Sequence, residues 1–147
     1  MKLPLTMAII DGMIVQIGAE RYIVPTISLK EALRLPKDAY FTVQGKGELV
    51  KVRDTLMPLV RLHSYFDEEP KYSDPWEALL LVVTEGAHSY CLLADEIVGR
   101  QEVVIKSLGS LFRRLPGISG GAILGDGRIA LIIDVKGIIS LYEERSR

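Results

Sequence analysis

One short string in the sequence has the spacing of a nucleophilic site. Gly117-Ile118-Ser119-Gly120-Gly121 matches G-x-S-x-G, in which a serine on a sharp strand-to-helix turn attacks an acyl carbon. That chemistry also needs a histidine to accept the serine proton. Ser119 meets neither requirement of the motif. A strand and a hairpin, rather than a helix, are expected after it, and both histidines, His63 and His88, come before it in the chain instead of after it. A glycine-rich strand is therefore favoured. A serine hydrolase using Ser119 stays as the alternative from another class, which labelling by a fluorophosphonate probe would support.

Groups that could hold a metal, a phosphate or a second proton are sparse. One cysteine, Cys91, and two distant histidines do not form a zinc-binding pattern. Neither a Walker A loop nor a dinucleotide-binding fingerprint occurs. The adjacent carboxylates Asp95 and Glu96 would point to opposite faces of a strand. We therefore predict no catalytic residue, no cofactor and no metal, and a binding or scaffolding module rather than an enzyme.

Composition excludes several other classes of protein. The chain has 147 residues, 48% of them hydrophobic, with 18 basic and 19 acidic side chains, so no broad basic field favours nucleic acid. A single cysteine cannot form an internal disulfide and fits a reducing compartment. The apolar run at 78–83 is far shorter than the roughly 20 residues of a membrane-spanning helix. We predict a cytoplasmic protein without nucleic-acid partners or direct membrane insertion.

Short hydrophobic runs separated by glycine-bearing turns predict a mainly β fold. The sharpest turn is Asp126-Gly127, because Asp-Gly between apolar runs is a strong hairpin signal. The predicted strands are Met13–Ile17, Arg21–Val24, Leu49–Val52, Leu56–Arg61, Leu79–Thr84, Ser89–Ala94, Glu102–Lys106, Ile118–Leu124 and Arg128–Ile133.

Three short helices are predicted. The capping box from Ser28 to Glu31 indicates a helix that ends before Pro36. A second helix is expected at Ser110–Leu115, before a Pro-Gly pair. The third is amphipathic and runs from about 134 to 143.

The chain also has signs of an internal duplication. Gly-Ala-x-x-Tyr occurs at 18–22 and again at 86–90, and the polar segment 67–75 lies between the two copies. This pattern favours two small barrels of about five strands each, at about 8–66 and 77–133, within one domain spanning 1–147. Units of about 60 residues have marginal cores, so the two barrels are expected to share an extensive interface.

Five strings, taken in chain order, resemble one family. They are Leu3–Met13, Val43–Arg53, Met57–Leu62, Gln101–Gly109 and Gly117–Val135, and they look like the C-terminal regulatory domain of the bacterial chemotaxis histidine kinases of the CheA family. The resemblance covers about residues 3–142. Asp54 departs from it, because the family usually has glycine there.

The resemblance implies a CheW-like fold of two SH3-like five-stranded β-barrels, with short helices and a C-terminal helix. It also implies a non-catalytic scaffold that binds the coupling protein CheW, the tips of chemoreceptors and other domains of the kinase, at receptor arrays on the inner membrane. The phosphoacceptor and ATP-binding domains of such kinases have no counterpart in these residues. A free-standing CheW-type adaptor is the near alternative.

Partner contacts are expected where apolar or long side chains lie beside turns, because a barrel end would present them there. The predicted contact residues are Thr26, Ile27, Leu56, Leu124 and Arg128.

Overall fold

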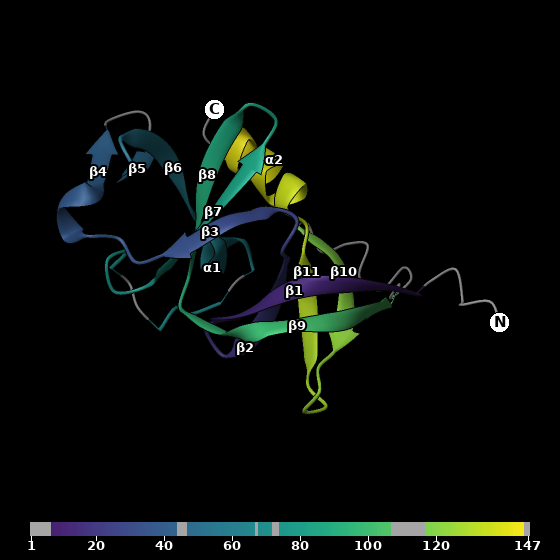
Figure 1. The fold of residues 1–147 in the computed structure, drawn as a ribbon. Helices are drawn as coiled ribbons and strands as arrows, with labels where there is room; N and C mark the ends of the chain where they lie inside the picture. The colour runs from purple at the N-terminus through teal and green to yellow at the C-terminus, as the bar shows by residue number, and fades with distance from the viewer. Residues whose placement is uncertain (1–6, 44–46, 67, 72–73, 107–116, 146–147) are drawn as a thin grey trace.

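A computed structural model of the chain has β-strands as its main elements (Figure 1). It describes residues 7–43, 47–66, 68–71, 74–106 and 117–145. The predicted mainly β class is confirmed. Among the described helices, none combines the length and apolar character needed to cross a membrane.

Five strands form a closed barrel, which we call the barrel lobe. In spatial order they are β1 (Met7–Ile17), β2 (Glu20–Pro25), β11 (Ile129–Ile133), β10 (Ile118–Ile123) and β9 (Glu96–Lys106). β11 lies parallel to β2, and the other described pairs are antiparallel. Closure removes free strand edges, which stabilises a small barrel.

Six strands form the second sheet, the sheet lobe. In spatial order they are β3 (Leu29–Leu33), β7 (Leu79–Glu85), β8 (His88–Ala94), β6 (Thr55–Arg61), β5 (Gly47–Val52) and β4 (Tyr40–Val43). Within the described residues, the helices are η1 (Lys37–Ala39), α1 (Leu62–Tyr65) and α2 (Val135–Arg145). This sheet therefore has six strands rather than the predicted five.

The lobes do not follow the predicted halves of the chain. The parallel pairs β2 with β11 and β6 with β8 each join a strand before residue 66 to one after residue 77. The barrel lobe takes its strands from both ends of the chain, and the sheet lobe takes its strands from the middle. The division at 8–66 and 77–133 is therefore wrong as a barrel boundary, because local repeats do not specify which distant strands pair.

The helix predicted at the Ser28 capping box is also wrong. Leu29–Leu33 is strand β3, which pairs antiparallel with β7. Leu29 and Ala32 pack against the buried core, so tertiary pairing overrides the local capping signal. The helix predicted at Ser110–Leu115 lies outside the described residues. The C-terminal helix is confirmed as α2, and the Asp134 carbonyl accepts its first hydrogen bond, from the Ile138 N–H.

The central hydrophobic core is shared between the lobes. It joins Ile17 and Val24 of the barrel lobe, Leu81 and Leu92 of the sheet lobe, and Ile138 of α2, all at most 1% exposed. A separate cluster fills the interior of each lobe. The two observed lobes thus share one core, although they are not the sequence halves between which an extensive interface was predicted.

Candidate partner-binding surfaces

The structure places Ser119 on a strand rather than on a nucleophile elbow. Ser119 lies in β10, a hairpin joins β10 to β11, and its hydroxyl donates to the Ile132 carbonyl at 3.4 Å. His63 lies in α1 and His88 begins β8, both in or beside the sheet lobe. The glycine before the serine has another role: Gly117 adopts a φ of 84°, and a Cβ there would clash with Ile138. The glycine-rich strand is thus confirmed.

Ile27 is the most exposed of the predicted contact residues. Ile27 lies in the turn between β2 and β3 and is 94% exposed. The N–H and the hydroxyl of Thr26 both donate to the Asp11 carbonyl at 2.9 Å. Thr26 therefore anchors an ordered turn that holds Ile27 in solvent.

Leu56 is also exposed, at 57%, beside the turn that joins β5 to β6. Arg53 and Asp54 form that turn with φ values of 48° and 67°. Two consecutive positive φ values are typical of a tight hairpin, and aspartate tolerates this region better than most residues. Asp54 therefore fits a hairpin at the position where the resemblance led us to expect glycine.

The prediction that Leu124 is presented to a partner is wrong, whereas the Arg128 side chain is exposed. Leu124 is 5% exposed and packs inside the barrel lobe with Ile14 and Ile23, so it cannot present its side chain to a partner. Its N–H donates to the Arg128 carbonyl at 2.7 Å, across the hairpin. The Arg128 side chain is 64% exposed, on the hairpin at the foot of Figure 1. The exposed candidates thus lie on more than one part of the fold: Leu56 belongs to the sheet lobe, Arg128 to the barrel lobe, and Ile27 to the turn that joins β2 to β3.

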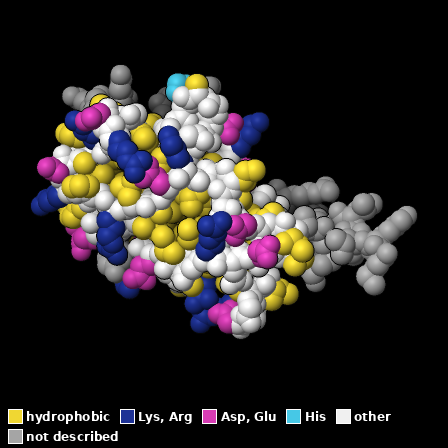
Figure 2. Space-filling model, viewed as in Figure 1, with side chains coloured by type: hydrophobic (Ala, Val, Ile, Leu, Met, Phe, Trp, Pro, Cys, Tyr) yellow, Lys and Arg dark blue, Asp and Glu magenta, His cyan; other side chains and the backbone are white. Residues whose placement is uncertain are grey.

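Sequence reasoning missed a row of exposed aliphatic side chains across the barrel lobe. Ile9 pairs with Val104 and Ile123 pairs with Ile129, and all four are between 39% and 64% exposed. Extending the register of β9 with β10 by one residue places Val104 beside Ile123. Figure 2 shows a second gathering of hydrophobic side chains over the middle of the visible face, among charged ones of both signs. Strand alternation could not reveal these surfaces, because it does not tell the outer face from the inner.

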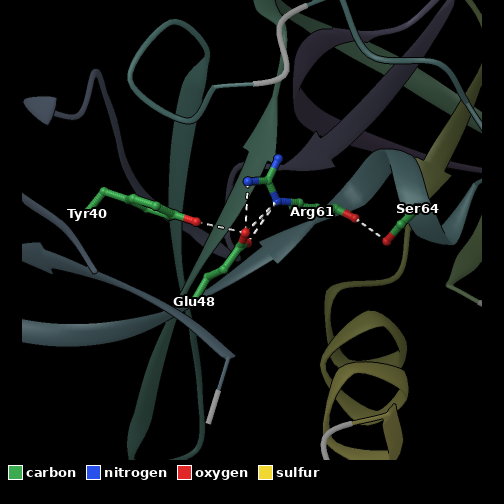
Figure 3. Close-up of polar contacts among 4 residues, drawn as sticks. All are labelled: Tyr40, Glu48, Arg61 and Ser64. Atoms are coloured by element: carbon green, nitrogen blue, oxygen red, sulfur yellow. Dashed lines mark hydrogen bonds and ion pairs between the residues drawn. The ribbon is translucent and has the colours of Figure 1, made fainter. Parts of the chain in front are cut away.

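A polar cluster in the sheet lobe joins three strands (Figure 3). The Tyr40 hydroxyl donates to Glu48 at 2.9 Å, and Arg61 donates to both oxygens of that carboxylate at 2.8 and 2.9 Å. The Ser64 hydroxyl donates to the Arg61 carbonyl. Burial alone would raise the pKa of Glu48, but the hydrogen bonds from Arg61 and Tyr40 outweigh it and lower that pKa. Glu48 therefore acts as a structural anion.

The lowered pKa of Glu48 predicts a pH-dependent contribution to stability. A carboxyl whose pKa is lower in the folded state stabilises the fold above its ordinary value of 4.5, and loses that contribution as the pH falls. In urea unfolding, the difference in stability between the wild type and Glu48→Gln should shrink between about pH 5 and pH 3. Glu144→Gln, an exposed control, should show no such trend; an equal trend in both variants would contradict the prediction.

A buried carboxylate ties the two lobes to the segment between β6 and β7. Asp95 is 4% exposed, and its Oδ2 accepts the N–H of Gly18 at 2.7 Å and the N–H of Lys71 at 2.9 Å. The Asp95 N–H in turn donates to the Gln16 carbonyl at 2.9 Å. One side chain thus holds together the β1–β2 turn, the β8–β9 junction and residue 71.

The same segment has a second attachment to the barrel lobe. Phe66 stacks on Tyr22 with ring centroids 4.7 Å apart, and the Tyr22 hydroxyl donates to Glu68 at 2.7 Å. Burial, together with the Glu68 carboxylate, raises the pKa of Tyr22. Sequence patterns did not reveal these contacts, which join residues far apart in the chain.

Comparison with known proteins agrees with this two-lobed architecture. The profile of the CheW-like domain matches residues 11–143, nearly the whole chain. The chain belongs to the CheW-like domain family. Among curated proteins, it is 36% identical over 143 residues to the chemotaxis protein CheA of Salmonella typhimurium, covering 97% of this chain and 21% of that one. It is 40% identical over 134 residues to CheA of Cereibacter sphaeroides, covering 90% of this chain and 19% of that one.

The CheW-like fold also has a solved counterpart. The crystal structure of the scaffolding protein TtCheW from Thermoanaerobacter tengcongensis matches with a TM-score of 0.65 and 13% identity. The match covers 86% of this chain and 90% of that one, and it supports the fold alone. Because the chain spans only about a fifth of the CheA relatives, it corresponds to one CheW-like domain within them.

Proposed function

We propose that this domain is a non-catalytic scaffold that links a chemotaxis histidine kinase to the coupling protein CheW and to the tips of chemoreceptors. The observation that carries the proposal is 36–40% identity to several CheA proteins along at least 90% of the chain. In this role the domain transmits receptor state by contact geometry, in the cytoplasm at receptor arrays. A free-standing adaptor is less well supported, because the likeness to a CheW structure has only 13% identity.

Exposed aliphatic residues in or beside turns support a contact role. Ile27 lies in a turn held by backbone hydrogen bonds, and Leu56 lies in β6 beside the turn that joins β5 to β6. Burying such side chains contributes about 1.5–3 kcal/mol each, and association entropy offsets part of that gain. An interface of modest size with micromolar affinity suits an assembly that must be switched.

Titration calorimetry with purified CheW tests this proposal. Ile27→Ser and Leu56→Ser are each expected to weaken binding about 10-fold or more, because each removes an aliphatic contact. Ile97→Ser is the matched control: Ile97 in β9 is 42% exposed and belongs to none of the candidate surfaces described above. Unchanged affinity in both test variants would reject these contacts, and absence of CheW binding by the wild type would reject the scaffold role.

A further inference from the structure

The sheet lobe contains a groove at the point where two parallel strands separate. β6 and β8 pair only through Leu59–Arg61 and Cys91–Leu93, and their preceding residues diverge toward the top of Figure 1. A cavity of about 370 Å³ lies between the diverging ends. It is lined by residues 55–58 of β6, by residues 87–90 at the start of β8 and by Glu143 of α2.

The groove opens on the face of the sheet that carries α2. Met57 faces the interior of the sheet lobe, whereas Val60 and Tyr90 face the core shared with α2. By strand alternation, Leu56 and His88 lie on this second face. Leu56 is exposed and Tyr90 is only 6% exposed, so the groove has an aliphatic wall over an aromatic floor.

The end of the groove at α2 is acidic. The Tyr90 hydroxyl donates to Oε1 of Glu143 at 2.7 Å. Burial raises the pKa of Tyr90 to about 12, and the carboxylates of Glu143 and Glu85 add to that shift. The lining includes no lysine or arginine. This charge favours a cationic group on a ligand.

The walls of the groove also present backbone for pairing. Along Thr55–Pro58, β6 pairs with β5 on its far edge, and along His88–Tyr90, β8 pairs with β7 on its far edge. No backbone pairing joins these two segments to each other across the groove, and both are fully described. Strand edges of this kind bind extended peptides through main-chain hydrogen bonds.

We propose that this groove binds an extended peptide segment of a partner protein, with an aliphatic residue against Leu56 and a lysine or arginine beside Glu143. Main-chain pairing with the open edges supplies affinity, and the acidic end selects the basic residue. The inference does not rest on the proposed scaffold function, because binding of a free peptide requires neither CheW nor a receptor.

Amide chemical-shift titration of the full chain with blocked hexapeptides tests this inference. The probe is acetyl-Val-Thr-Val-Lys-Val-Thr-amide, and matched peptides carry Glu or Gln in place of the lysine. The lysine peptide should shift the amides of Thr55–Met57 and His88–Tyr90, and it should bind at least about fivefold more tightly than the glutamate peptide. A version of the lysine peptide whose backbone nitrogens are methylated has no main-chain N–H groups to donate, and it should lose binding.

Variants of α2 separate selective binding from nonspecific attraction. Glu143→Gln should remove most of the preference for lysine, whereas Glu144→Gln, one residue further along α2 and outside the lining, should leave it unchanged. No shifts at about 5 mM peptide, shifts at other residues, or equal affinity for the lysine and glutamate peptides would each overturn the inference. The same amides shifting on concentration of the protein alone would show instead that a second copy of the chain occupies the groove.

Discussion

Replacing Asp95 by alanine is expected to lower the free energy of unfolding by about 3 kcal/mol. The substitution leaves the N–H groups of Gly18 and Lys71 without their acceptor at a buried position. Hydrogen bonds to a charged group contribute about 1.5–3 kcal/mol each, and the vacated space admits partial repair by water. Urea unfolding measures the loss, and hydrogen exchange at the Gly18 and Lys71 amides should accelerate beyond the change in global stability.

Two further variants test whether the lost acceptor accounts for this loss of stability. Asp95→Asn keeps an amide oxygen that can accept one or both bonds, so it should be milder than alanine. Asp126→Ala removes an exposed carboxylate that also accepts a backbone N–H, that of Arg128, and should change the unfolding midpoint little. If Asp95→Ala lowered the free energy of unfolding no more than Asp126→Ala does, the role assigned to Asp95 would be contradicted.

The Asp95 contacts also bear on the scaffold role proposed above. Its two acceptor bonds connect a turn of the barrel lobe with the segment that leads into the sheet lobe. Phe66 and Glu68 attach the same segment to Tyr22. A partner that contacts both lobes therefore acts on units whose relative position is fixed by specific contacts, and that fixed geometry suits a scaffold.

Local sequence signals predicted most strands but not their partners. Alternation and Asp126-Gly127 located β10 and β11, because a hairpin depends on neighbouring residues. β3 was missed because its signal is a capping box, and its strand conformation depends on pairing with β7, about fifty residues away. The parallel pair of β2 with β11 depends on the closure of the barrel, which no local pattern encodes.

The candidate surfaces were predicted less completely than the fold. Turn chemistry correctly indicated that Ile27 and Leu56 would be exposed. It failed for Leu124, because the residue that follows a strand can still point into the barrel. The groove beside Tyr90 was not predicted at all, since it exists only where β6 and β8 come together and then separate.

Cutting the chain between the two predicted halves should abolish independent folding of both. A cut at residues 72–73 separates β2 from β11, β6 from β8 and β1 from β9. It also divides the shared core, leaving Ile17 and Val24 on one fragment and Leu81 and Ile138 on the other. Fragments of about 70 residues have marginal cores even when complete. Each fragment alone should therefore lack a cooperative urea transition and well-dispersed amide resonances.

An equimolar mixture of the two fragments is expected to recover both properties, because every interrupted pairing and the shared core can then re-form between chains. The matched control is the intact chain carrying a protease site at the same position and cleaved after folding, which should remain folded as a two-fragment complex. A cooperative transition in either fragment by itself would contradict this expectation. It would mean that one lobe can be completed without strands from the other half, against the strand order of both sheets. Recovery only on mixing would show that each lobe requires strands from both halves of the chain.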